Sequence, residues 1–209
     1  MKYKYTSKLR VGFTLVELLV VLGLFSGIAT LALGSLFNVQ SINAKLQTTQ
    51  TILDNVNLSV STISREIHFG SRFHCVATLS TVIPRTRKSC PKSAGGGSVL
   101  ILKPSDASTS TDRVAFYLQK GVLYKDEYYG GGTTTLQMTA NDVFISSLIF
   151  YVNGAQTSDG SNDVGGAQDY EQPSITLLIS GKPNNQAVMA SSSEFNIQTT
   201  VSPTEIDGI

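Results

Sequence analysis

The sequence contains no tryptophan, only two cysteines and almost no net charge. Among its 209 residues, 16 are Lys or Arg and 15 are Asp or Glu, which gives a formal net charge of +1. A chain with this balance has no bulk electrostatic attraction for nucleic acid or for acidic substrates. The length suffices for one domain of ordinary size with an additional segment.

Sequence motifs that carry catalysis or metal binding are absent as well. The chain has no G-x-S-x-G nucleophile motif, no phosphate-binding loop and no H-E-x-x-H zinc motif. His68 and His74 have no recognised ligand spacing to the cysteines, so we expect two solvent-exposed histidines rather than a metal site. An acidic flexible loop is preferred over a Ca²⁺ site for four further residues, whose spacing matches no EF-hand. They are Asp159, Asn162, Asp163 and Asp169. We therefore expect a protein that is not an enzyme and needs no cofactor or metal.

Charge and proline are both absent from a long stretch near the N-terminus. No charged residue occurs from Leu18 to Ala44, and no proline occurs from Phe13 to Gly70. The uncharged stretch exceeds the roughly 20 residues with which a helix crosses the hydrocarbon core of a membrane. Its large apolar side chains together favour insertion by roughly 5–8 kcal/mol, against at most about 3 kcal/mol for the opposing carboxylate of Glu17. We therefore predict a membrane-spanning helix.

The residues before this helix are basic. Four cations and no acid lie in the first ten residues: Lys2, Lys4, Lys8 and Arg10. By the positive-inside rule this end stays in the cytoplasm, and everything after the helix faces outward. A secretory signal peptide would have a shorter apolar region followed by a small-residue cleavage site. Neither that alternative nor a plain single-pass anchor explains the carboxylate of Glu17 just inside the apolar run.

Glu17 closes the run Gly12-Phe13-Thr14-Leu15-Val16-Glu17, which follows the basic leader and opens the apolar helix. This run resembles the class III signal of type IV prepilins. The resemblance implies cleavage after Gly12 by a membrane aspartyl prepilin peptidase and N-methylation of the new terminus at Phe13. It also implies that Glu17 sets the assembly register by neutralising the α-amino group of a neighbouring subunit. The alternative for Glu17 is an interfacial carboxylate that extends to the lipid headgroups.

The apolar periodicity continues beyond the membrane-length stretch. One helix face carries apolar residues at alternating spacings of four and three: Ile42, Leu46, Thr49, Leu53, Val56, Val60, Ile63 and Ile67. A coiled-coil dimer is the alternative interpretation. With only about four heptads and few flanking charges, packing onto a sheet of the same chain is preferred. Gly70 is the expected helix stop.

After Gly70 the pattern becomes typical of strands. Six segments rich in β-branched and aromatic residues are bounded by Gly, Pro, Asn or Ser: 99–102, 113–118, 122–124, 148–152, 175–179 and 195–201. Lys120-Gly121 predicts a tight hairpin turn between two of them. The predicted fold class is therefore α+β, with a long N-terminal helix packed on a mainly antiparallel sheet. Its regions are a basic leader (1–12), a transmembrane or filament-core helix (13–37), an amphipathic second half of the helix (38–70) and an extracytoplasmic β-rich domain (71–209).

The order of these segments resembles a subset of the same family. The helix ends on Ile63-Ser64-Arg65-Glu66-Ile67, and the chain closes on an apolar strand at 195–201. This order is similar to J-type minor pseudopilins of type II secretion, to W-type minor pilins of type IV pili and to a competence pseudopilin. The resemblance implies a subunit that acts in small numbers and primes assembly at the filament end. Its implied partners are the prepilin peptidase, other pilin or pseudopilin subunits and an assembly platform in the inner membrane. The implied location is the cytoplasmic membrane, and then an extracytoplasmic pilus or pseudopilus.

The two cysteines lie in the region predicted to be outside the cell. Disulfides persist there, so pairing of Cys75 with Cys90 is favoured over two free thiols. Such a bridge closes a loop of about 15 residues and is worth roughly 3 kcal/mol in the loop-entropy model. Five basic residues surround the pair: Arg72, Arg85, Arg87, Lys88 and Lys92. Solvated loop charges are the preferred interpretation, and the alternative is a subunit that grips DNA or a surface through this patch.

Overall fold

The structure, a computed structural model, describes residues 12–80, 83–84, 86–155, 172–184 and 194–204. The chain divides into two units, Met1–Gln47 and Thr48–Ile209. One helix, α1 (Leu15–Phe69), begins in the first unit and ends in the second. The four candidate Ca²⁺ ligands considered above lie outside the described residues.

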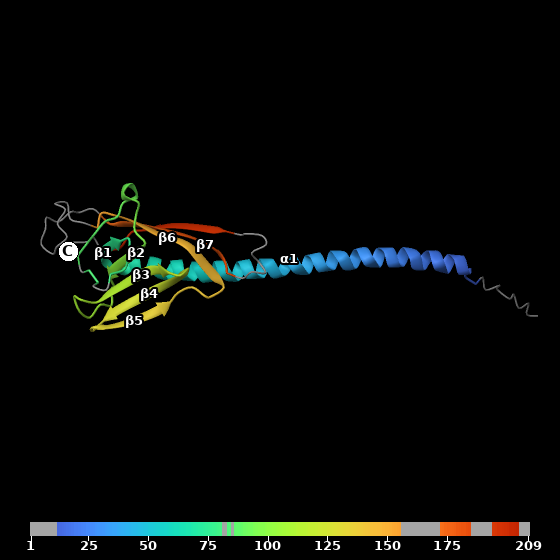
Figure 1. Cartoon of the computed structure of the whole chain (residues 1–209), viewed down its shortest axis with the longest axis horizontal. Coiled ribbons are helices and arrows are strands. Elements are labelled where there is room, and N and C mark those ends of the chain that lie inside the picture. Colours follow the sequence, from blue (N-terminus) through green and yellow to red (C-terminus); the bar gives the residue numbers. More distant parts are fainter. Residues whose placement is uncertain (1–11, 81–82, 85, 156–171, 185–193, 205–209) are drawn as a thin grey trace, which may run out of the picture. The chain divides into compact units, whose positions relative to one another are not determined.

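Eight strands follow α1 in the described residues and form two antiparallel sheets (Figure 1). The first sheet has the order of its sequence: β1 (Ser71–Val76), β2 (Val99–Lys103), β3 (Arg113–Gln119), β4 (Val122–Tyr129) and β5 (Gly132–Gln137). The second sheet contains β6 (Val143–Asn153), β7 (Ser174–Pro183) and β8 (Phe195–Val201). A helix followed by antiparallel sheets confirms the predicted α+β class.

A short segment joins the two sheets. The N–H of Cys75 donates to the carbonyl of Lys88, and the N–H of Lys88 donates to the carbonyl of Phe73, so Lys88 lies beside β1. Cys90 and Val152 exchange both of their backbone hydrogen bonds, at 2.9 and 3.1 Å, which places Cys90 against β6. The segment therefore lies first along the edge of β1 and then along the edge of β6.

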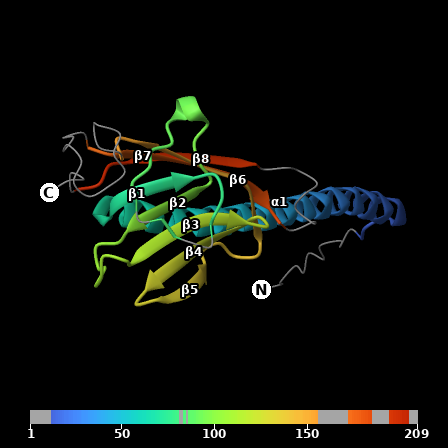
Figure 2. The same cartoon turned by 60° about the vertical axis from the view of Figure 1, so that its left-hand side comes forward.

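One face of α1 is buried under both sheets in the second unit (Figure 2). Ile52 is 2% exposed, and Val56, Ile63 and Ile67 are 0% exposed. Full burial of such a side chain stabilises a fold by roughly 1.5–3 kcal/mol. The same core cluster includes buried residues of both sheets: Phe73, Leu100, Phe116, Phe150 and Leu177. The prediction that the second part of the helix packs onto a sheet of its own chain is thus confirmed.

The buried stripe is shorter than the predicted one: Ile42 and Leu46 are 51% and 55% exposed, and Thr49 is half-buried. Leu53 and Val60 were expected on the buried face, but both are half-buried, and the residues before them, Ile52 and Ser59, take their places. Ser59 was not expected there and is 2% exposed. A straight helix of 3.6 residues per turn drifts away from a strict seven-residue repeat, so the face shifts by one residue along this length.

All six predicted strand segments lie within strands, and the predicted turn is present. Lys120 and Gly121 have φ angles of 51° and 80°, as a type I′ hairpin turn requires. Gly130 and Gly131 repeat this pattern between β4 and β5, with φ angles of 59° and 84°. Strands β1 and β5 were not predicted.

Candidate assembly interface

The start of α1 combines a helix cap with an acidic first turn. The N–H of Glu17 donates to Oγ1 of Thr14 at 3.3 Å, and the N–H of Leu18 donates to the carbonyl of Thr14 at 3.2 Å. A threonine at the N-cap with a glutamate three residues later fits the capping-box pattern. The carboxylate of Glu17 also complements the positive end of the helix dipole. Glu17 therefore has a local role that the T-x-x-E spacing signals but that was not predicted.

The first unit presents an apolar surface. Its large apolar side chains from Phe13 to Leu46 are each between 51% and 81% exposed. The helix is long and apolar enough here to cross a membrane. Gly12 and Phe13 come before the helix and are exposed. An apolar surface of this extent is suited to lipid or to other apolar helices rather than to water.

In the second unit, α1 has an exposed line on the side away from its buried stripe. Leu58, Arg65 and Phe69 are seven and four residues apart and therefore share one helix face. Leu58 is 68% exposed and Phe69 is 54% exposed. The exposed apolar side chains of α1 thus continue past the first unit, now with a cation between them.

Lys125 connects β4 with the helix through two carboxylates. Its Nζ lies 2.7 Å from Oε1 of Glu66 on α1 and 2.9 Å from Oε1 of Glu127. Burial lowers the pKa of Lys125, but hydrogen bonds to both glutamates and their negative charges outweigh this effect and raise it overall. The three side chains are only 12%, 18% and 26% exposed. Ion pairs of this kind contribute more to the position of the helix on β4 than to net stability.

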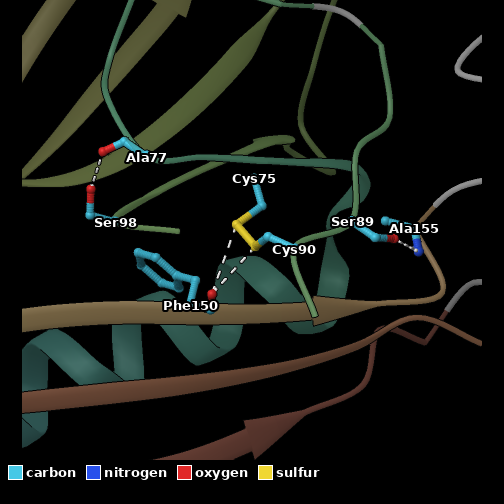
Figure 3. The surroundings of a disulfide bond; sticks show 7 residues. All are labelled: Cys75, Ala77, Ser89, Cys90, Ser98, Phe150 and Ala155. Atoms are coloured by element: carbon cyan, nitrogen blue, oxygen red, sulfur yellow. Dashed lines mark hydrogen bonds between the residues drawn. A yellow bond between two sulfur atoms is a disulfide. The ribbon is translucent and has the colours of Figure 1, made fainter. Parts of the chain in front are cut away.

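The structure contains the predicted disulfide between Cys75 and Cys90 (Figure 3). The two Cα atoms are 5.8 Å apart, and the residues are 1% and 7% exposed. The carbonyl oxygen of Phe150 lies 3.3 Å from Sγ of Cys90 and 3.9 Å from Sγ of Cys75. These are packing contacts, because a disulfide sulfur carries no proton to donate. The bridge therefore fixes β1, the joining segment and β6 at one point.

The loop between the two cysteines covers the outer face of the first sheet. Leu79 and Ile83 pack there against a small buried cluster on β2 and β3, formed by Val99, Ile101 and Ala115. The disulfide closes this loop at both ends, so it holds a second, smaller hydrophobic layer in place.

A buried carboxylate lies on the same outer face. Asp126 is 5% exposed and accepts hydrogen bonds from the hydroxyls of Tyr117 at 3.1 Å and Tyr128 at 3.0 Å. Burial, together with the negative charge of Asp126, raises the pKa of Tyr117 to about 12. Both carboxylate oxygens are satisfied within the chain, so we assign this cluster a structural role.

The two histidines have different surroundings. His68 is exposed, as expected, with Nδ1 3.2 Å from the carbonyl oxygen of Ser202. His74 is only 7% exposed, with Nδ1 2.8 Å from the carbonyl oxygen of Thr86, so its expected exposure is wrong. The cause is long-range: the loop after β1 folds back over His74. Within the described ranges no group of three or more His, Cys, Asp or Glu residues could hold a metal ion.

The basic residues near the disulfide do not form one free patch. Arg72, in the left-handed region at φ 54°, and Arg87 both take part in interactions within the chain. Lys88 belongs to the segment that joins the sheets, and Lys92 begins a short 3₁₀ helix, Lys92–Ala94. Arg85 lies outside the described residues.

Comparisons with protein-family models, with curated proteins and with solved structures gave no match to this chain. A functional interpretation must therefore come from the residues themselves. The two features with the clearest chemical meaning are the start of α1 at Gly12–Glu17 and the contrast in surroundings along that helix.

Proposed function

We propose that this chain is a minor pilin or pseudopilin, a membrane-inserted precursor that joins a type IV pilus-like filament. The observation that carries the proposal is the run Gly12–Glu17, which stands between a basic leader and an exposed apolar helix. An apolar helix surface is compatible with lipid before assembly and with neighbouring helices after it. The buried second part of α1 gives the same helix a fixed attachment to an outer domain.

The proposed pathway has three steps. The prepilin peptidase cleaves after Gly12, and the new N-terminus at Phe13 is methylated. The apolar helix stays in the cytoplasmic membrane while the β-rich domain lies outside, where the Cys75–Cys90 disulfide is stable. The assembly platform then lifts the helix into a bundle, and helix–helix packing replaces the lipid contacts.

Glu17 has two separable roles in this proposal. Its backbone N–H donates to the capping hydroxyl of Thr14. Its charge neutralises the α-amine of a neighbouring subunit. A carboxylate left unpaired in an apolar bundle costs several kcal/mol, so only the stagger that brings an amine to Glu17 is tolerated. The charge then selects the register of assembly more than it adds stability.

The segment order described above supports a minor subunit of the J-type or W-type kind, which acts in small numbers at the filament end. Such a subunit serves a type IV pilus, a type II secretion pseudopilus or a competence system. A subunit that binds DNA or a surface directly has less support. Two of the five basic residues that would carry such binding, Arg72 and Arg87, already interact within the chain.

Processing is tested by mass spectrometry of the full chain recovered from membranes of a cell with a prepilin peptidase. The expected mature chain begins at Phe13 and carries one added methyl group on its α-amine. A Gly12→Leu variant is expected to keep its leader, because the peptidase must fit an extended backbone with no side chain at this point. An intact Met1 in assembled material would reject the proposal.

The charge of Glu17 is tested separately from its cap. A Glu17→Gln variant keeps a capping-box residue but loses the charge, whereas Thr14→Ala loses the cap and keeps the charge. We expect Glu17→Gln to enter filaments as poorly as Glu17→Ala, and Thr14→Ala to enter almost normally. Normal incorporation of Glu17→Gln in the correct stagger would show that the charge does not select the register.

A further inference from the structure

Within the part of the chain that the structure describes, the outer strands β5 and β8 have edges with none of the usual protection against pairing. All six residues of β5 are exposed, and neither strand contains a charged residue or a proline. Their registers with β4 and β7 run without a bulge. Natural proteins usually protect an edge with lysine, proline or a bulge, or cover it with another segment. Strand β1 shows such protection, with a register shift between Ser71 and His74 and a bridge to Lys88.

The backbone groups on the open side of β5 follow from its turn. Gly130 and Gly131 form a two-residue hairpin loop, so Tyr129 and Gly132 are a hydrogen-bonded pair. By alternation, residues 132, 134 and 136 bond to β4, and the N–H and C=O groups of residues 133, 135 and 137 point to the other side. No strand within the described ranges pairs with that side of β5.

The chain directions of the two open edges are opposite. β5 runs parallel to β1, because four successive antiparallel pairings separate them. The joining segment is parallel to β1 at Lys88 and antiparallel to β6 at Cys90, so β6 is antiparallel to β1. β8 has the same direction as β6 and is therefore antiparallel to β5. Two copies in the same orientation can thus join β5 to β8 as an antiparallel pair.

The two faces of these edges also match. On the helix side, β5 presents Leu136, which is 44% exposed, and β8 presents Ile197, which packs against the core. On the other side both strands are polar, with Thr135 on β5 and Gln198 on β8. A joined sheet would therefore place Leu136 beside the apolar side chains of β8, and the polar faces of both strands together, with no charge on either strand to repel the partner.

We propose that the β5 edge of one subunit pairs with the β8 edge of a second copy of this chain, which extends the sheets from copy to copy. A six-residue edge is too small to hold two proteins together in dilute solution. Anchoring in one membrane or filament supplies a common orientation and a high effective concentration. The inference rests on the proposed function in one respect only: anchoring in a membrane or filament gives the copies their common orientation.

The test uses the full chain in membranes, with Thr135→Cys on β5 and Gln198→Cys on β8. Oxidation is expected to link copies of the double variant into a short ladder of dimers and small oligomers, because each copy carries both halves of the contact and the proposed subunit acts in small numbers. Each single variant should stay monomeric. The matched control pairs Gln198→Cys with Thr111→Cys, an exposed loop position, and should give no ladder. The native cysteines are buried and already paired, so they do not interfere.

A second variant blocks the edge without disturbing the fold. Thr133→Pro removes one outward N–H and leaves the bonds to β4, whereas the control Thr134→Pro removes a bond to β4. Added to the double-cysteine variant, Thr133→Pro should abolish the ladder and leave the unfolding temperature nearly unchanged. Thr134→Pro should lower that temperature. An undiminished ladder with Thr133→Pro would overturn the inference.

The remaining outcomes separate the two proposals. Linkage of Thr135→Cys alone means that β5 pairs with β5, which overturns the inference. A missing ladder in material whose leader has been removed after Gly12 overturns strand pairing and leaves the pilin proposal standing. A ladder formed by chains that keep their leader in a cell with a prepilin peptidase supports strand pairing and overturns the cleavage on which the pilin proposal depends.

Discussion

Helix α1 is one continuous element, but its two parts lie in opposite surroundings. In residues 13–47 every large apolar side chain is at least 51% exposed. In residues 48–69 the four apolar residues of the buried stripe are at most 2% exposed. The backbone conformation is helical throughout, so the difference comes from the side chains and from what covers them.

The distribution of polar residues explains this difference. Residues 18–37 of the first part are apolar on all faces, and such a helix needs apolar surroundings on all sides. The second part has Asn, Gln, Ser and Thr between its apolar residues, so only one face can be buried against a sheet. The apolar content of a helix predicts that it needs apolar surroundings. The spacing of its apolar residues predicts whether its own chain can cover one face or whether lipid or other helices must cover all of them.

The contrast is tested most strongly by removing one apolar side chain from each part. Ile63→Ala creates a cavity in the core and is expected to lower the free energy of unfolding of the β-rich domain by about 3–4 kcal/mol. Leu22→Ala removes an exposed side chain and is expected to change that free energy by less than about 0.5 kcal/mol. Denaturant unfolding in detergent measures both. Equal effects would show that the two parts do not differ in this way.

The disulfide sharpens the same contrast, because it belongs only to the second unit. The double variant Cys75→Ala and Cys90→Ala frees a 15-residue separation in the unfolded chain, and the expected loss of stability is about 3 kcal/mol. Limited proteolysis should also cut the loop between these positions first, because without the disulfide the loop that carries Leu79 and Ile83 is no longer fixed at its two ends. An unchanged unfolding temperature and cleavage pattern would contradict this role.

Local chemistry was sufficient to predict much of the fold. The β-branched and aromatic segments mark six of the eight described strands, and the Lys120-Gly121 turn follows from the φ angles that its two positions need. The pairing of Cys75 with Cys90 was predicted because only two cysteines exist on the side expected to be oxidising. In each case the deciding information lies within a few residues or in a simple count.

The missed features depend on residues far away in sequence. Strand β5 is uncharged and threonine-rich, with every residue exposed, and becomes a strand because β4 offers it a hydrogen-bonding partner. His74 is buried because the carbonyl of Thr86 folds back onto it. Ser59 occupies a core position because its hydroxyl finds the carbonyl of Met138, 79 residues away. Burial of a polar group is decided by such a partner, and a local pattern does not contain it.

The hydroxyl of Ser59 allows a test, with a smaller expected effect, of how the second part of α1 is attached to the sheets. Oγ of Ser59 lies 2.9 Å from the carbonyl oxygen of Met138 and 3.0 Å from that of Asn55, so it can donate to either. Ser59→Ala removes this donor from a buried position and should lower the free energy of unfolding by about 1 kcal/mol. Ser61→Ala, at an exposed position on the same helix, is the matched control and should have almost no effect. Equal effects of the two substitutions would contradict the assigned role of Ser59.

The smallest expected effect is a dependence of domain stability on pH through His74. Burial lowers the pKa of this imidazole below its ordinary value, the hydrogen bond to Thr86 raises it in part, and the charge of Lys88 lowers it further. The unfolded chain therefore takes up the proton first as the pH falls, which favours unfolding. Stability should be constant above about pH 6.5 and should decline below it until the folded protein is protonated as well. Denaturant unfolding between about pH 7.5 and 5.5 measures this decline. His74→Gln should remove it and His68→Gln should retain it, whereas the same decline in His74→Gln would assign the effect to another group.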